Sequence, residues 1–230
     1  KSVAGGSAQP GTISTAGTAN ASTLQLDGGA ASFRVGTATD LFNVTGTFSV
    51  TSASTVRAIP GNAISGSFPQ TFTVIDYTGS IGGLGFAGLS YSSANPHLTG
   101  TLVDDTVNTQ VKVQISAADS VVWKGNVNGN WDVNTTANWV LGSDGTTPSN
   151  YYDYDVVTLN DTGIATPTIT LVGTITPATL SVGNTTGTYT LQGSPISGST
   201  SLAKTGAGGL TLLANNNYGG TTTINGGTVT

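Results

Sequence analysis

The chain has 230 residues, a formal net charge of -5 and 7% charged residues, and it contains neither cysteine nor methionine. Its six basic residues are scattered, whereas nucleic-acid binding needs a Lys/Arg patch that displaces counterions from the phosphates, so a nucleic-acid partner is excluded. The lack of cysteine excludes disulfides, and no stretch approaches the ~20 consecutive apolar residues of a membrane-spanning helix.

The residue types predict an all-β protein. All eleven acidic residues are Asp, so the helix formers Glu and Met are both missing, whereas Thr, Gly, Asn and Val, which favour strands and turns, are abundant. In the first half we predict strands over residues 23–26, 32–35, 41–44, 47–50, 55–59, 71–77 and 111–115. Strands at this spacing fit a sandwich, a barrel or the coils of a solenoid.

A boundary between two β-repeat blocks is predicted near residue 118, which gives a first block over 1–118 and a second over 119–230. The second block begins with the three tryptophans of the chain, Trp123, Trp131 and Trp139, which are eight residues apart each time. Asn and Gly between them favour turns, so the indoles are expected to converge. One interpretation is a platform on which glycan rings stack; the other is a cover for the junction between the blocks.

Further strands are predicted over residues 155–159, 168–172, 178–182, 188–192 and 209–213. From Lys204 to Thr230 short runs with apolar residues at alternate positions are separated by Gly and Asn clusters, which is typical of strands with one buried face joined by tight turns. The residues that carry this pattern are Lys204, Gly206, Gly208, Leu210, Leu212, Asn216, Tyr218, Gly220, Thr222, Ile224 and Gly227.

These eleven residues resemble the passenger-associated repeat of bacterial autotransporters, the autotransporter-associated β-strand repeat. The resemblance implies a secreted or surface-attached bacterial protein that folds as a right-handed parallel β-helix, or β-solenoid. Tandem β-sandwich domains are the alternative fold, and the two differ in whether neighbouring strands are parallel.

The candidates for metal binding and catalysis are a few aspartates and the single histidine. Asp153, Asp155 and Asp161 lie close to a tyrosine cluster and offer carboxylate oxygens of the kind that calcium prefers, but their spacing matches no calcium loop, so we predict no metal and no cofactor. His97 is the single histidine, and it stands in a turn sequence, Asn-Pro-His. Asp104 is adjacent to Asp105, so the two should point to opposite faces of a strand.

Arg34 and Arg57 are isolated in the sequence and offer no base beside a carboxylate. We therefore predict no catalytic residues, and a polysaccharide-degrading enzyme is the least favoured reading.

The favoured function is an extracellular or cell-surface structural segment that associates with copies of itself into a fibre or surface layer. An adhesin or glycan-binding module that uses the tryptophans to contact extracellular polysaccharide is the alternative. The sequence stops at Val229 and Thr230, inside a predicted strand, so the chain is expected to continue in a longer protein or to pair there with a neighbour.

Overall fold

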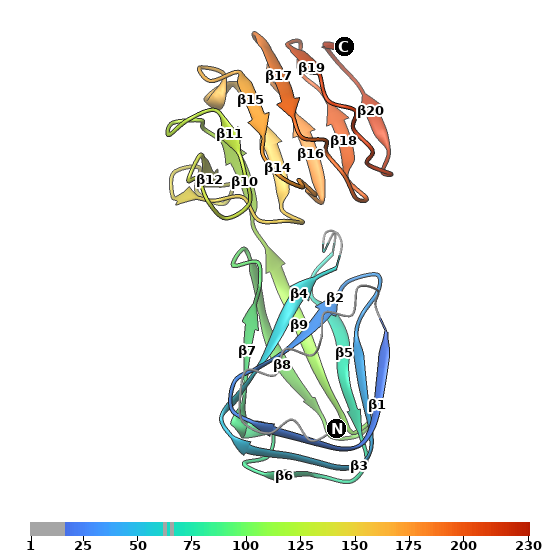
Figure 1. Ribbon diagram of the computed structural model, residues 1–230. Coiled ribbons are helices and arrows are strands. Elements are labelled where there is room, and N and C mark those ends of the chain that lie inside the picture. The colour runs from blue at the N-terminus through green and yellow to red at the C-terminus, as the bar shows by residue number, and fades with distance from the viewer. Residues whose placement is uncertain (1–16, 62–63, 65–66) are drawn as a thin grey trace. The chain divides into compact units, whose positions relative to one another are not determined.

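The computed structural model describes residues 17–61, 64 and 67–230. These residues form an all-β protein in which most neighbouring strands are parallel, with two short 3-10 helices, η1 (Phe86–Gly88) and η2 (Asp161–Gly163) (Figure 1). Across the described part of the chain, no helix has the length and apolar character needed to cross a membrane. The residues divide into two compact units, 17–61 with 67–117 and 118–230 with Ile64.

The first unit contains nine strands. They are β1 (Thr18–Asp27), β2 (Ala30–Val35), β3 (Leu41–Ser52), β4 (Ser54–Pro60), β5 (Gln70–Tyr77), β6 (Ile81–Gly83), β7 (Leu89–Ser93), β8 (Leu98–Asp105) and β9 (Gln110–Ala118).

The strands of the first unit alternate between two sheets as the chain advances. One sheet has the order β1-β3-β5-β9-β8, with β6 paired to β3, and the other has the order β2-β4-β7. The pairs up to β7 are parallel. Leu24 lies opposite Phe48 and Ala31 opposite Val56, so the first turn of the chain takes 24 or 25 residues, whereas Phe48 lies opposite Ile81 and Ser54 opposite Leu89, so the next takes 33 to 35. β9 then pairs antiparallel with β5 and ends this progression.

Two expectations about individual strands can be compared with this unit. The alternation in β9 is confirmed, because Val111, Val113 and Ile115 are buried and Lys112 and Gln114 are not. The expected turn between residues 44 and 47 is wrong, since β3 runs through it. A register irregularity against β1 accommodates one extra residue of β3, so the chain stays in the sheet.

The second unit contains twelve strands. They are β10 (Ser120–Trp123), β11 (Asn130–Trp131), β12 (Trp139–Leu141), β13 (Pro148–Ser149), β14 (Val156–Leu159), β15 (Thr168–Leu171), β16 (Thr179–Val182), β17 (Thr188–Gly193), β18 (Ser201–Lys204), β19 (Gly209–Leu212), β20 (Thr222–Ile224) and β21 (Thr228–Val229).

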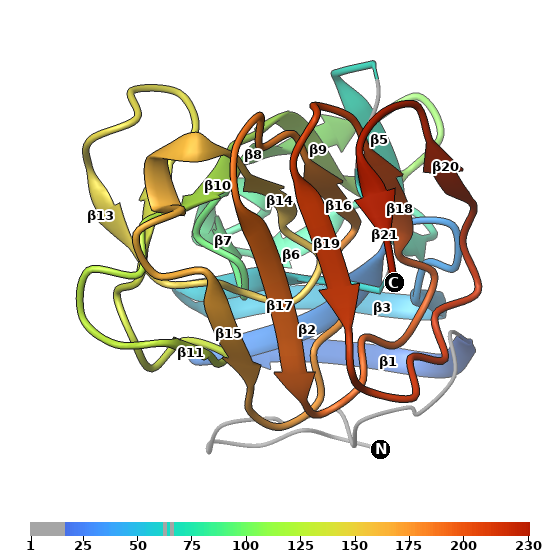
Figure 2. The same cartoon turned by 90° about the horizontal axis from the view of Figure 1, so that it is seen from above.

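These strands also alternate between two sheets, ordered β13-β12-β10-β14-β16-β18-β20 and β11-β15-β17-β19-β21. From β14 onward every pair in the first of these sheets is parallel, and so is every pair in the second (Figure 2). Val157 lies opposite Leu180, Leu180 opposite Leu202 and Leu202 opposite Thr222, which are steps of 23, 22 and 20 residues. The chain therefore returns to the same sheet after each coil of about this length.

The core of the second unit is a column of stacked apolar side chains. Alternate residues of each strand point inward, so Ile169, Tyr189 and Leu210 of one sheet face the interior together with Leu180 and Leu202 of the other, and all five are buried. Parallel pairing places each of them next to its counterpart in the following coil. Each coil thus buries its apolar face against its neighbours rather than around a single centre.

Candidate functional site at the two ends of the second unit

The three tryptophans converge at the first end of the second unit. Trp139 of β12 lies between Trp123 of β10 and Trp131 of β11, with ring centroids 4.9 and 5.0 Å away, and Tyr151 is 5.3 Å from Trp131. The rings meet edge to face, the arrangement that aromatic quadrupoles favour. The turns between the tryptophans thus assemble one aromatic cluster, as their spacing predicts.

Burial decides what this aromatic cluster can do. Trp123 and Trp131 have no exposed surface and Trp139 is 1% exposed. A sugar ring stacks on an open aromatic face, and none of the three indoles presents one in this structure. The expected glycan platform is therefore not formed, because the indoles pack on one another and on the column of core residues. The alternative interpretation, a cover for the junction between the blocks, stays a prediction.

The indole N–H groups of this cluster make few hydrogen bonds. Trp123 donates its Nε1–H to the carbonyl oxygen of Thr166 at 3.1 Å, whereas Nε1 of Trp131 and of Trp139 is buried without an oxygen or nitrogen acceptor. Their edge-to-face neighbours, including Tyr151 at 80° to Trp131, offer aromatic faces as weak acceptors. The cluster is built for packing rather than for polar recognition.

Two buried asparagines, Asn138 and Asn184, hold corners of the coils. The sequence pattern did not predict them. Asn138 accepts from the backbone N–H groups of Val127 and Asn128 and donates to the carbonyl oxygen of Asn130 at 2.7 Å. Asn184 donates to three carbonyl oxygens, including that of Gly209 in the next coil at 3.3 Å. Asn within a Thr/Gly-rich turn was the available signal, but it does not reveal which amides become buried.

The first part of the predicted repeat motif forms a corner of the coil. Lys204 ends β18 opposite Val182, is fully buried, and donates from Nζ to the carbonyl oxygens of Thr205 and Gly206. Burial lowers the pKa of Lys204, because the ammonium group has lost water. The long side chain therefore continues the apolar column while its charge is held by turn carbonyls.

The rest of the motif builds the following strands and the next corner. Asn216 accepts from the N–H of Ile196 in the preceding coil at 2.8 Å, and the hydroxyls of Tyr218 and Thr222 are 3.0 Å apart. The remaining motif residues lie in the two corners, in β19 and in β20; they are Gly208, Leu210, Leu212, Gly220, Ile224 and Gly227. All eleven residues belong to the last stacked coils, from β18 to the corner before β21. The tryptophans lie at the opposite end of the strand order, in β10, β11 and β12.

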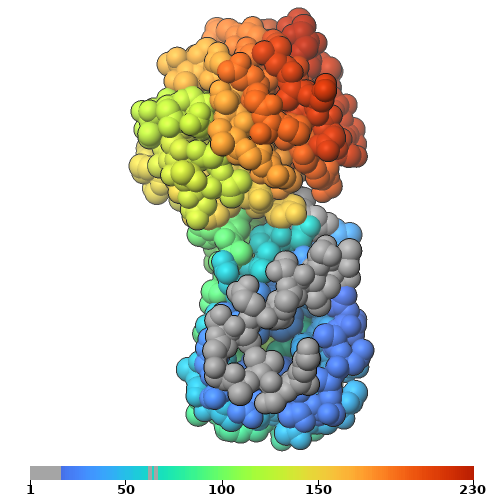
Figure 3. Space-filling model, in the orientation of Figure 1, coloured from blue at the N-terminus to red at the C-terminus, as the bar shows by residue number. Residues whose placement is uncertain are grey.

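The two ends of the stacked strands differ. At the first end, β12 pairs antiparallel with β10 and β13 pairs antiparallel with β12, above the aromatic cluster. At the other end, β20 and β21 are the last strands of their sheets, and their residues lie at the surface, coloured red in Figure 3. We call this second end the open end.

Backbone and core are both uncovered at the open end. Thr221 accepts from Leu202 N–H at 2.9 Å and Asn225 donates to the Lys204 carbonyl at 2.8 Å, so the backbone groups of the alternate residues Thr222 and Ile224 face away from β18. Ile224 lies opposite Lys204 in the column and is 53% exposed. Chemically, this end offers strand-pairing groups and an apolar cross-section, the features that let another strand add.

The aspartates suggested as calcium ligands are engaged in turns. Asp153 accepts from the hydroxyls of Tyr151 and Thr176, and Asp161 accepts from Thr185 of the next coil, whose hydroxyl lies 2.6 Å away. Within the described residues no group of three or more carboxylates or histidines is arranged to hold a metal ion. These carboxylates connect consecutive coils instead.

The turn carboxylates predict a dependence of stability on acid. Hydrogen bonds, first from the Thr147 hydroxyl and then from the N–H groups of Thr147 and Thr146, lower the pKa of Asp144 from 3.8 to about 2, and hydrogen bonds from Thr185 and Thr186 lower the pKa of Asp161. Because the folded pKa lies below the unfolded one, this stabilisation is complete above 3.8 and is lost as the pH falls toward 2.

We therefore expect the denaturant midpoint of the second unit, followed by tryptophan fluorescence, to fall across this pH range. An Asp161→Asn variant should show a smaller fall, because one titrating group has been removed. An equal fall in both proteins would contradict this role of Asp161.

The candidate catalytic residues remain apart or engaged in local structure. His97 is 8% exposed in the turn before β8, and its backbone N–H donates to Oδ1 of Asn95 at 2.9 Å. Arg34 pairs with Asp40 at 3.1 Å, whereas Arg57 lies in β4 opposite Ser92.

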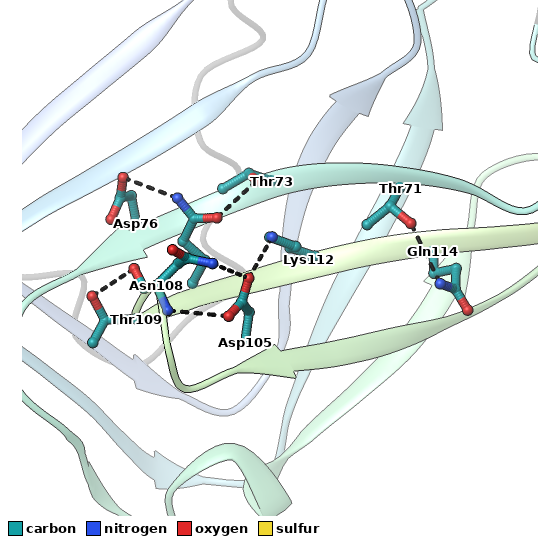
Figure 4. Close-up of polar contacts among 9 residues, drawn as sticks. Thr71, Thr73, Asp76, Asp105, Asn108, Thr109, Lys112 and Gln114 are labelled. Carbon is teal, nitrogen blue, oxygen red and sulfur yellow. Dashed lines mark hydrogen bonds and ion pairs between the residues drawn. The ribbon is translucent and has the colours of Figure 1, made fainter.

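Asp105 takes part in a polar network of β8, β9 and the turn between them (Figure 4). Its carboxylate lies 2.5 Å from Nζ of Lys112 and accepts from both the backbone and the side chain of Asn108. These hydrogen bonds, the one from Lys112 above all, lower the pKa of Asp105 to about 2. The network holds the turn between β8 and β9. Burial raises the pKa of Tyr77, and the nearby charges of Asp104 and Asp105 raise it further.

Comparison with known proteins finds no match, whether with family models, with curated proteins or with solved structures. The resemblance of residues 204–230 to the autotransporter-associated repeat therefore stays a prediction.

Proposed function

We propose that the chain is a structural, non-catalytic segment of an exported bacterial protein, folded as a right-handed β-solenoid that associates with copies of itself. The observation that carries the proposal is the parallel stacking of successive coils, which leaves the strand-pairing groups and core side chains of β20 and β21 available to a following coil or to a second copy.

Strand direction and register support a solenoid rather than tandem sandwiches. Sandwich sheets are built from antiparallel neighbours, whereas successive coils here pair in parallel at steps of 20 to 23 residues. When a crossover joins two parallel strands of one sheet, the connection is right-handed in ~98% of known cases. This preference supports a right-handed solenoid. The residue content also suits stacking, since small uncharged side chains allow coils to lie close together.

The open end can be extended by a following coil or by a strand of a second copy. A strand that pairs with β20 would use the backbone groups of Thr222 and Ile224 and would cover the exposed Ile224 side chain. The other sheet ends in β21, whose neighbour would cover Val229.

Export from a bacterial cell is supported by the resemblance of residues 204–230 and by composition. A chain without cysteine carries no thiols through an oxidising envelope, and its 7% charged residues leave little repulsion between copies. Extracellular or cell-surface localisation follows from the same resemblance.

Self-association is tested by sedimentation velocity and electron microscopy of the purified chain at several concentrations. We expect the wild type to form larger species as concentration rises, with filaments at the highest concentration. Thr222→Pro removes an outward N–H at the edge without removing a hydrogen bond to β18, and it should keep the chain monomeric.

Thr222→Ser is the matched control, because it changes the same side chain and keeps the N–H. It should assemble like the wild type. A wild type that stays monomeric at every concentration would overturn self-association through the open end, and so would assembly that Thr222→Pro leaves intact.

A further inference from the structure

The outer face of the sheet β11-β15-β17-β19-β21 carries a regular array of threonines. Thr168, Thr190, Thr211 and Thr230 lie opposite one another on four neighbouring strands, in one row that crosses the sheet. The hydroxyls of Thr211 and Thr230 are 3.0 Å apart. We call this surface the threonine face; Figure 2 shows its strands β15, β17, β19 and β21 lying side by side.

A second threonine two residues away along the strand accompanies the row on three of the four strands. Thr188 and Thr228 lie on one side of the row and widen it into a lattice there, whereas Thr170 lies on the other side, opposite Gln192. On β19 the corresponding position is Gly209, opposite Thr188 and Thr228. Because glycine has no side chain, nothing projects from the sheet at this position between Thr188 and Thr228.

The spacing of the lattice follows from the parallel sheet. Neighbouring strands are ~4.8 Å apart and residues two apart on a strand are separated by about 6.6 Å, so hydroxyl and methyl groups repeat in two directions. The inward residues between the threonines, Ile169, Tyr189 and Leu210, are buried in the core and hold each strand in place. No Lys, Arg or Asp lies within β15, β17, β19 or β21.

We propose that the threonine face binds ice. Each hydroxyl can both donate and accept a hydrogen bond, and the methyl groups beside them restrict where water can sit, so a rigid lattice holds a layer of water in fixed positions. The ~4.8 Å repeat across the strands is close to an oxygen repeat of hexagonal ice, which lets that layer merge with the crystal along the row. Absence of charge matters because a charged side chain would orient its own hydration shell instead.

The stability of the sheet does not by itself account for this lattice. Thr is a good strand former, and threonine pairs across strands stabilise a sheet, but the other sheet of the same unit does without them. Its outward row runs through Val122, Thr158, Ser181, Ala203 and Thr223. That mixed row has the same backbone geometry and serves as an internal control.

Ice binding is tested with the full chain by inhibition of ice recrystallisation and by enrichment in a slowly grown ice shell. We expect the wild type to inhibit recrystallisation and to enter the ice. Thr190→Tyr places a bulky ring in the centre of the face and should raise the concentration needed by about tenfold, equivalent to ~1.4 kcal/mol of binding. Ser181→Tyr places the same ring on the mixed row and should behave like the wild type.

Folding of each variant is verified by its tryptophan fluorescence, and Thr211→Lys provides a second variant of the face if Thr190→Tyr does not fold. A folded wild type that neither enters ice nor slows recrystallisation would overturn the proposal. Equal activity of the wild type and the face variants would overturn it too, as would an equal loss in Ser181→Tyr. These outcomes are independent of whether copies of the chain associate.

Discussion

Replacing Trp139 with alanine is expected to destabilise the second unit by roughly 3–5 kcal/mol, the cost of deleting a large buried aromatic side chain. Trp139 is 1% exposed and touches Trp123, Trp131 and Tyr151, so its removal leaves a cavity at the centre of the aromatic cluster. The surrounding strands cannot close this cavity easily, because β10 is paired with β12 and β14, and β11 is paired with β15.

The measurement is denaturant unfolding followed by tryptophan fluorescence. All three tryptophans belong to the second unit, so Trp123 and Trp131 still report its unfolding in the variant. Val127→Ala is the control, since Val127 lies in the same region but is 61% exposed, and it should change the midpoint little. A Trp139→Ala protein with wild-type stability would contradict the structural role of the cluster and would reopen glycan contact as the reason for the tryptophans.

Replacing Gly206 with alanine is expected to cost about 2–5 kcal/mol, which combines a left-handed backbone with a clash between coils. Gly206 has φ 56°, and a Cβ added to it would lie 2.4 Å from the carbonyl oxygen of Asn184 in the preceding coil. That oxygen belongs to the backbone, so it cannot move aside without shifting the corner. The coils could then no longer stack at their normal distance.

Gly145→Ala separates the two contributions. Gly145 has φ 66°, so alanine there meets the same backbone strain, but no heavy atom lies within 4 Å of the added Cβ. Its cost should be only about 1–2 kcal/mol. Both variants are compared with the wild type by the same fluorescence-detected unfolding, and equal losses in the two would show that the contact between coils contributes nothing at Gly206.

Strands were predicted best where apolar and polar residues alternate without interruption. Residues 111–115 and 188–192 lie within β9 and β17, and their inward residues are buried. Prediction failed where a local signal competes with tertiary contacts. Thr45 and Gly46 look like a turn, yet β3 continues through them because β1 and β5 pair with its first half.

The candidate residues show the same difference between local and distant contacts. The eight-residue spacing of the tryptophans predicted that they converge, but spacing cannot tell an exposed platform from a buried cluster. That distinction depends on Tyr151 and on the core column, which come from other coils. Likewise, the sequence places Asp153 and Asp161 close together, whereas hydrogen bonds to Thr176 and Thr185 of later coils decide their roles.

Composition and periodicity alone determine that this chain is all-β, poor in charge and organised in short strands with tight turns, because these properties depend on each residue and its near neighbours. The tertiary structure alone decides that the strands of successive coils pair in parallel, that the indoles are buried, and that seven threonines share one face. The first and last of these features join residues about 20 positions apart, and the indoles are buried together with core residues of later coils. The register of the sheets brings them together, and no local pattern encodes that register.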